Sequence, residues 1–213
     1  MMPNRLLVLD ASGPVARAAL FDGDVAVAVR ADNGARGPAA VVPALVRAVL
    51  AGQERPDAVA AIVGPGGFTG LRAALAFAQG VADGRGIPAI AVTAPEALGV
   101  GQPPGRTLWC VQTARSNLVY LTRDDATVTL PLDALPMPDG PIAVAGDAAP
   151  RGAAALAARG ADVRLSDARY PAPAAIASVA RARVAGLVAP RAFIPLYAEP
   201  PLVRPARVRP TPA

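Results

Sequence analysis

The sequence predicts an α/β protein of two lobes, each built on a mixed sheet flanked by helices. Residues 1–101 contain three consecutive strand patterns, followed by helix, strand, helix, strand and helix patterns. This order partly repeats beyond residue 102, and the stretch Gln102-Pro103-Pro104-Gly105 breaks the pattern between the two copies. We therefore expect an N-terminal lobe over residues 1–101, a degenerate C-terminal lobe over 102–199, and a disordered Pro- and Arg-rich tail over 200–213.

Apolar runs and turn residues define the elements of the first lobe. Residues 6–9 form a continuous apolar run, as in a central strand, and residues 22–24 (Asp-Gly-Asp) suit a hairpin turn. Pro38 suits the first position of a helix, which needs no N–H, and Thr93 suits the cap of another. The expected strands are 6–9, 15–21, 25–29, 58–63 and 89–92, and the expected helices are 38–50, 69–83 and 94–100.

The second lobe shows the same order with one element missing. Prolines spaced over residues 131–141 stand where the first lobe has its first helix. The expected strands are 107–112, 118–123, 128–130, 142–145 and 163–165, and the expected helices are 150–159 and 173–184. The shared order resembles that of ribonuclease H-like lobes in actin-like ATPase domains. The predicted fold class is therefore a two-lobed ribonuclease H-like/actin-like (ASKHA) fold with mixed sheets.

The composition excludes several kinds of site. The chain has no His, and all 21 basic residues are Arg because the sequence contains no Lys. A Ser–His mechanism, a His-ligated metal centre, a lysine Schiff base and a Walker-type lysine are therefore excluded. The net charge is +5 and the arginines are spread along the chain, which favours an ordinary solvated surface over a nucleic-acid site.

We expect a soluble cytoplasmic protein without a membrane segment. No uninterrupted apolar run reaches the ~18 residues needed to span a bilayer, and the run at residues 6–9 is too short for a signal peptide. The single Cys110 excludes an internal disulfide and fits a reducing compartment.

A glycine-rich segment joins a predicted strand to a predicted helix. It reads Gly64-Pro65-Gly66-Gly67-Phe68-Thr69-Gly70-Leu71-Arg72 and resembles the Gly-Pro-Gly-Ser-Phe-Thr-Gly-hydrophobic-Arg signature of the TsaB (YeaZ) family. This is a glycoprotease-like family of the ribonuclease H/actin-like superfamily. The resemblance covers residues 5–201. The further matching blocks are Asp10, Gly80-Val81-Ala82, Pro88, Val92-Thr93, Glu96-Ala97-Leu98, Ala114-Arg115, Val119-Tyr120 and Pro195-Leu196-Tyr197.

The resemblance implies a role in installing threonylcarbamoyl on tRNA adenosine (t6A modification). The chain would be a non-catalytic partner that binds and stabilises the catalytic paralogue TsaD, with the ATPase TsaE also engaged and tRNA contacted only indirectly. It implies no required cofactor and leaves open ATP or ADP with Mg at a partner interface, as well as a homodimer. The chain departs from the family pattern at four places, which favours a scaffold over an enzyme. Ala11 stands where the family has Thr, Pro38 where it often has His, Thr113 where it has Asp, and Ala198-Glu199 where an Arg commonly follows.

Candidate nucleotide- or phosphate-binding residues lie at the end of the first strand and in the glycine-rich turn. Such a turn presents N–H groups to an anion, but it also serves simply to join a strand to a helix. Asp10 suits a cation site or a turn, and Ser12 suits a phosphate contact or the same turn. The candidates are Asp10, Ser12, Gly66, Gly67, Thr69 and Gly70, and we assign no catalytic or metal-ligating residue.

The two first-lobe helices are the expected partner interface. Helices 38–50 and 69–83 are apolar almost all round, which predicts burial on more than one side. One side would cover the sheet, and either a partner or the second lobe would cover the other. The interface candidates are Val42, Leu45, Val49, Leu71, Ala73, Leu75, Ala76 and Gly80.

Three functions follow from the sequence. The first is the non-catalytic partner in t6A modification. The second is an actin-like nucleotide-binding ATPase or phosphotransferase, which needs acidic Mg²⁺ ligands, for which the cleft candidates are Asp10 and Asp147. The third is a protease acting on TsaD, for which a Ser–His mechanism is excluded.

Overall fold

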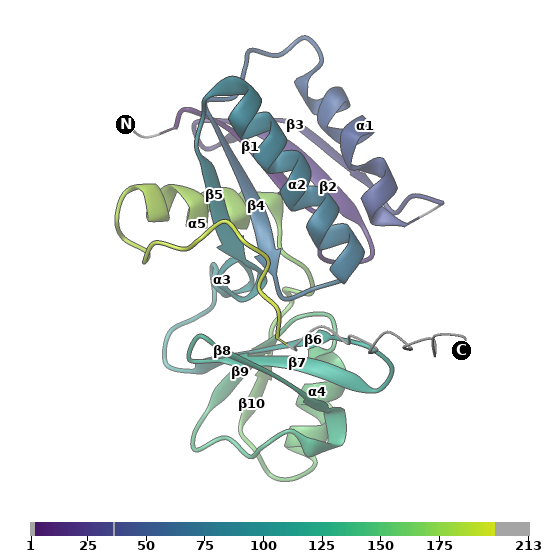
Figure 1. Cartoon of the computed structure of the whole chain (residues 1–213). Helices are drawn as coiled ribbons and strands as arrows, with labels where there is room; N and C mark the ends of the chain where they lie inside the picture. Colours follow the sequence, from purple (N-terminus) through teal and green to yellow (C-terminus); the bar gives the residue numbers. More distant parts are fainter. Residues whose placement is uncertain (1–2, 36, 199–213) are drawn as a thin grey trace, which may run out of the picture.

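The computed structural model describes residues 3–35 and 37–198 and has two lobes, each with a five-stranded sheet (Figure 1). The first sheet has the strand order β3-β2-β1-β4-β5. Its first three strands form an antiparallel meander, and the last two run parallel to β1. The strands are β1 (Arg5–Asp10), β2 (Ala16–Asp22), β3 (Val25–Asp32), β4 (Ala58–Gly64) and β5 (Ala89–Thr93).

Two helices cover one face of the first sheet (Figure 1). α1 (Pro38–Leu50) packs on β2 and β3, α2 (Phe68–Arg85) packs on β4, and the two helices contact each other. α1 begins at Pro38, as expected for a position that needs no N–H. α2 ends at Gly86, whose φ of 65° allows the left-handed C-cap conformation.

The second sheet repeats the strand arrangement of the first. Its order is β10-β9-β6-β7-β8. Strands β6, β7 and β8 form an antiparallel meander, and β9 and β10 run parallel to β6. A short 3-10 turn, η1 (Leu132–Ala134), stands in the proline-containing stretch where the first lobe has α1. The other elements are β6 (Thr107–Thr113), β7 (Leu118–Arg123), β8 (Ala126–Pro131), β9 (Ile142–Ala145), α4 (Ala149–Ala157) and β10 (Val163–Leu165).

Helix α5 (Pro173–Val184) follows the second sheet in the chain but packs on the first. It contacts β1, β4, β5 and the short helix α3 (Ala94–Gly99). The division at residue 102 assigned this helix to the C-terminal lobe, and the structure corrects that assignment. The face of the first sheet opposite α1 and α2 is apolar, and α5 covers it with Ile176, Ala177, Val179 and Ala180.

The chain after α5 runs back along the first lobe toward the second (Figure 1). Arg183 on α5 pairs with Glu96 on α3 and donates to backbone carbonyls on β5 and at Ala189. Further along, the N–H of Leu196 donates to the carbonyl of Val63 at the end of β4 (2.7 Å). These contacts fix the C-terminal segment against the strand that leads into the glycine-rich turn.

The predicted fold class is confirmed, because both lobes carry the expected strand order and mixed sheets. The predicted cap of α3 is present as well: Thr93 Oγ1 accepts from the N–H of Glu96 (3.2 Å), whose carboxylate accepts from the N–H of Thr93 (2.7 Å). Among residues 3–35 and 37–198, no helix combines the length and the apolar character that crossing a bilayer requires. The tail predicted over 200–213 lies outside the described residues.

Candidate functional site

The turn after β1 is organised around the carboxylate of Asp10. Its Oδ1 accepts from the N–H of Ser12 (2.8 Å) and from the Ser12 hydroxyl (2.6 Å). Asp10 is buried, and the guanidinium of Arg17 lies 3.9 Å from its Oδ2. Burial raises the pKa of Asp10 above its ordinary value, although the bonds from Ser12 and the charge of Arg17 oppose this shift. The carboxylate therefore closes a turn on Ser12.

The glycine-rich turn packs directly against this first turn. The N–H of Gly67 donates to the carbonyl of Ser12 (2.7 Å). A Cβ built on Gly66 would lie 2.6 Å from Ser12, and one built on Gly70 would lie 2.1 Å from the carbonyl oxygen of Ala11. Glycine is therefore required at both positions for two backbone turns to touch. One of the N–H groups expected to face an anion is instead used within the chain.

A cleft of about 400 Å³ lies between the lobes. Three of the six predicted nucleotide-site residues, Ser12, Gly66 and Gly67, line it from the first lobe. Asp10 and Gly70 are buried behind the cleft wall, and Thr69 is exposed on the first turn of α2. The structure thus brings only half of that set together at the cleft.

The second lobe contributes polar side chains to the cleft. Asp147 Oδ1 accepts from the N–H of Thr113 (2.9 Å), and the buried Oε1 of Gln112 has no partner among the described residues. The ring of Tyr170 lies beside Gly13, with the guanidinium of Arg17 5.5 Å from its centroid. Of the described residues that line the cleft, Asp147 is the acidic one and none is an arginine. A phosphate in the cleft would therefore have no cationic side chain among these residues to pair with.

Sequence reasoning named Asp147 but missed Gln112 and Tyr170. Gln112 continues a buried strand, and Tyr170 lies in a loop after β10, so neither stood out as part of a motif. Arg115 and Tyr120, which belong to two of the matching blocks, are exposed and half-buried, and neither lines the cleft. Cys110 is buried, and burial raises the pKa of its thiol to about 12, which leaves it protonated and unreactive.

The predicted partner interface is corrected by the packing of α1 and α2. Apolar residues on the sheet-facing sides of these helices lie in the core of the first lobe, where a partner cannot contact them. Ala73 is half-buried, whereas Ala76 and Gly80 are exposed. The helices looked apolar almost all round because their outer sides carry several Ala and Gly residues between the polar ones. The candidates now placed in the core are Val42, Leu45, Val49, Leu71 and Leu75.

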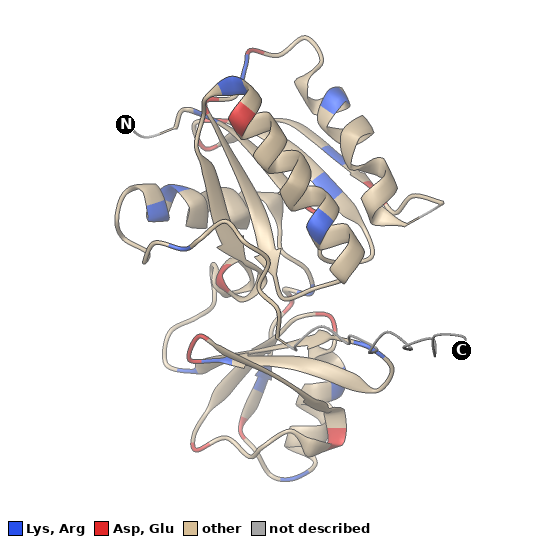
Figure 2. Ribbon diagram, in the orientation of Figure 1, with Lys and Arg blue, Asp and Glu red and all other residues tan. Residues whose placement is uncertain are grey.

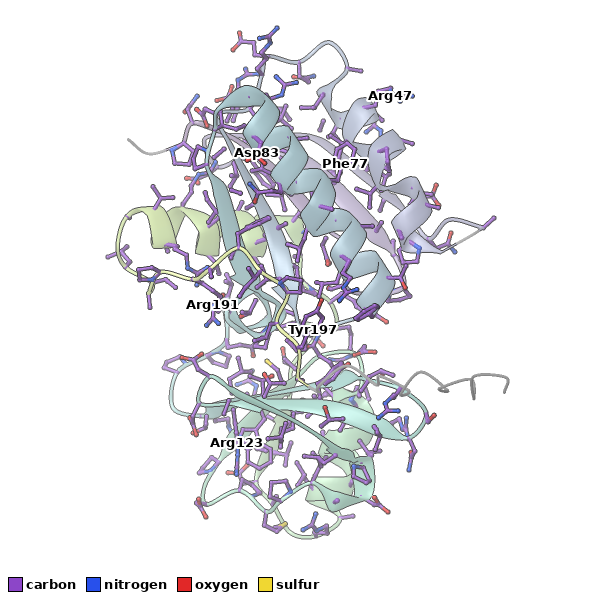
Figure 3. All side chains as sticks on the ribbon, viewed as in Figure 1. Arg47, Phe77, Asp83, Arg123, Arg191 and Tyr197 are labelled. Carbon is purple, nitrogen blue, oxygen red and sulfur yellow. The ribbon has the colours of Figure 1, made fainter. Side chains whose placement is uncertain are left out.

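Among residues 3–35 and 37–198, no segment covers the outer side of α1 and α2. The second lobe lies beyond the N-terminal end of α2 and not over this side (Figure 1). Figure 3 shows Phe77 between the two helices, Arg47 on α1, and Asp83 near the far end of α2. Asp83 accepts a hydrogen bond from Gln79 (2.7 Å). We call this side the helix face; its exposed residues are Ala40, Pro43, Ala44, Arg47, Ala48, Thr69, Arg72, Ala76, Gln79, Gly80, Asp83 and Gly84.

Three side chains form a stacked cluster at the N-terminal end of the helix face. The Arg72 guanidinium lies 3.8 Å from the ring centroid of Phe68 and 5.4 Å from that of Tyr197. Its Nε donates to the Tyr197 hydroxyl (2.7 Å). The sequence placed Arg72 and Tyr197 in separate matching blocks, and only the path of the C-terminal segment brings them together.

Comparison with known proteins gives a family-model match and similar solved structures. Residues 39–131 match the family model described as TsaD, tRNA N6-adenosine threonylcarbamoyltransferase. No curated protein matches the chain. The resemblance expected from the glycine-rich signature is confirmed as a similarity. Part of the chain matches the TsaD family model, and the fold is like that of solved YeaZ structures.

Two solved structures from Pseudomonas aeruginosa are similar to the whole chain. One is an uncharacterized protein with similarity to the peptidase YEAZ; it is 23% identical with a TM-score of 0.72, over 92% of this chain and 100% of that one. The other is YeaZ, 23% identical with a TM-score of 0.68, over 91% of this chain and 99% of that one. At this identity the likeness establishes the shared fold.

Proposed function

We propose that this chain acts in t6A modification of tRNA as a non-catalytic partner of a TsaD-family protein, which it binds through the helix face. The observation that carries the proposal is the range of the family match. Residues 39–131 include α1 and α2, but the range begins after the Asp10–Ser12 turn. The part that resembles the transferase family therefore contains the helix face and lacks the carboxylate that an actin-like active site would place at the end of β1.

The contacts of the glycine-rich turn also support a binding role for the helix face and no catalytic role for the Asp10 turn. Asp10 closes a turn on Ser12, and the carbonyl of Ser12 then accepts from Gly67. These groups hold β1, β4 and α2 together, and so they stabilise the helix face from beneath. A protein that presents a fixed pair of helices to a related fold gains affinity because little ordering is needed on binding.

The proposed assembly has further members. The TsaD-family protein would carry the catalysis, a TsaE-type ATPase would join the pair, and tRNA would be contacted through the partner. We expect the pair to bury more than about 1,200 Å² in total, as stable protein interfaces do. The protein would act in the cytoplasm, where tRNA is modified.

Co-purification tests the proposal. The tagged chain, produced with the TsaD-family protein of the same genome, is expected to elute as a stable complex in size-exclusion chromatography. Deleting its gene should lower t6A in total tRNA, measured by mass spectrometry of nucleosides, and the wild-type gene should restore it. Failure to associate at micromolar concentration, or unchanged t6A after deletion, would contradict the proposal.

A nucleotide in the interlobe cleft is the second candidate function. The observation that favours it is the cleft itself, where Ser12, Gly66 and Gly67 face Asp147, whose carboxylate could accept from the ribose hydroxyls or the base of a nucleotide. Calorimetric titration with ATP and ADP in the presence of Mg²⁺ tests it directly. Saturable binding by the isolated chain that Asp147→Asn abolishes would support this candidate, and the absence of heat at millimolar nucleotide would remove it.

A further inference from the structure

Arg72 is held in one orientation on the helix face, next to the small residues Ala76 and Gly80. Its guanidinium stacks on the ring of Phe68, and its Nε donates to the Tyr197 hydroxyl. The stacking fixes the plane of the guanidinium, and the hydrogen bond fixes the direction of its Nε–H edge. The ring centroids of Phe68 and Tyr197 lie 5.9 Å apart. Both residues are about half exposed, with 52% of the surface of Phe68 and 45% of that of Tyr197 accessible to solvent. An exposed arginine normally loses side-chain entropy on binding, and here much of that loss has already occurred on folding.

The described residues leave the terminal nitrogens of Arg72 unused. Within residues 3–35 and 37–198, neither Nη atom has a hydrogen-bond partner or an ion pair. The remaining N–H groups of a guanidinium form a planar fork that matches a carboxylate in a bidentate pair. Two aromatic walls and an arginine are also the side chains most common at the energetic centre of protein interfaces.

The charges on the helix face point to an acidic partner. Figure 2 shows blue segments on both α1 and α2 and a red segment near the C-terminal end of α2. Arg47 and Arg72 lie on the face, and Arg55 and Arg85 line a shallow hollow of about 350 Å³ at its far end. The carboxylate on the face, Asp83, already accepts from Gln79. A partner must therefore bring carboxylates to this surface to balance its charge.

A second copy of this chain fits the face less well. Antiparallel packing of two α2 helices would offer Asp83 of one copy to Arg72 of the other. It would bring no further carboxylate of the helix face to Arg47, Arg55 and Arg85. RNA also fits less well. Next to Arg72 the face carries Ala76 and Gly80, whose small size admits a closely packed helix but offers no hydrogen bond to a phosphate backbone.

We infer that Arg72, fixed by Phe68 and Tyr197, is the anchor with which the helix face recognises a carboxylate on a docking helix of a different, acidic partner protein. This inference rests on the proposed function and specifies the chemistry of that interface. Tyr197 acts as a positioning residue: it orients the guanidinium, and Arg72 makes the contact.

Calorimetry with the TsaD-family protein of the same genome tests the anchor. Arg72→Ala should weaken binding by about tenfold or more. Arg72→Lys should recover little of this loss, because an ammonium keeps the charge but not the planar fork. Tyr197→Phe should weaken binding by a smaller factor, since it keeps the ring and removes the acceptor for Nε. Arg47→Ala is the matched control, an exposed arginine of the same face without aromatic neighbours, and should have a smaller effect than Arg72→Ala.

The outcomes separate this inference from the proposed function. No binding by the wild-type chain overturns both. Wild-type binding that Arg72→Ala leaves within twofold overturns the anchor alone. Two further results also overturn it: Arg72→Ala and Asp83→Asn each abolishing self-association in sedimentation without affecting the partner, or Arg72→Ala weakening binding of unmodified tRNA but not of the partner. Circular dichroism melts that match the wild type establish that each variant is folded.

Discussion

The N–H of Gly67 donates to the carbonyl of Ser12 across 2.7 Å, and this bond joins the turn after β1 to the turn that starts α2. In an actin-like fold these two turns face the interlobe cleft, so their donors are the ones a bound anion would use. Here the bond between them is internal. The glycine-rich turn, which suggests a ligand-binding loop in the sequence, therefore fixes α2 and with it the helix face.

Substitution of the glycines should separate packing from ligand binding. Gly70→Val places a Cβ about where the Ala11 carbonyl oxygen lies, since the two would be 2.1 Å apart. We expect a loss of roughly 2–3 kcal/mol in the free energy of unfolding, because backbone must move to accept it. Gly67→Ala is the matched control: its Cβ would lie 3.4 Å from the Ser12 carbonyl, an ordinary contact. Chemical denaturation measures both, and equal effects of the two substitutions would argue against the packing role.

The buried carboxylate predicts a pH dependence of stability. Because the pKa of Asp10 is raised in the folded state, mainly by desolvation, folding favours its protonated form. Its stabilising contribution is therefore full below the unfolded pKa, near 3.8, and is lost as pH rises through the folded pKa. Asp10→Asn keeps an acceptor for Ser12 and removes this titration. The difference in Tm between Asp10→Asn and wild type should therefore shift in favour of Asn as pH rises from 3 to 7, and a shift in the opposite direction would show that the ionised form is the stabilised one.

Arg183 should be the most sensitive arginine for stability. Its side chain is 7% exposed and joins α5, α3 and the C-terminal segment through Glu96 and two backbone carbonyls. Among the described residues, Arg183→Ala leaves Glu96 with Arg191, 3.6 Å away, as its ion-pair partner, and should cost about 3 kcal/mol. Arg47→Ala, on the exposed outer side of α1, should change stability by less than about 0.5 kcal/mol. Urea unfolding of the two variants decides this, and comparable midpoints would contradict the role given to Arg183.

The sequence predicted the elements and their order along the chain well, because the patterns that define them are local. The hairpin turn at residues 22–24, Pro38 and the Thr93 cap each identified an element end that the structure confirms. It could not show that α5 crosses to the first sheet, since the periodicity of a helix does not reveal which sheet it covers. For the same reason it assigned core residues such as Leu75 to the partner interface.

The sequence identified several residues of the candidate site but did not show which residues they contact. The glycines were recognised as a turn, but their partner, the carbonyl of Ser12, carries no sequence signal. The stacking of Arg72 on Phe68 follows from helical spacing, whereas Tyr197 reaches them only because Leu196 is hydrogen-bonded to Val63. Long-range placement of this kind depends on tertiary packing, which a local pattern does not encode.

The central claim, that the helix face acts by binding and the Asp10 turn does no chemistry, is tested most directly by t6A levels in cells. Ala76 is exposed at the centre of the face, so Ala76→Arg should fold normally, yet it would desolvate a guanidinium in the interface at a cost of about 3 kcal/mol. In a strain whose only copy of the gene carries the substitution, we predict loss of both the complex and t6A for Ala76→Arg, and near wild-type levels of both for Asp10→Asn. Folded Asp10→Asn protein that binds the TsaD-family protein normally but fails to support t6A would contradict the account.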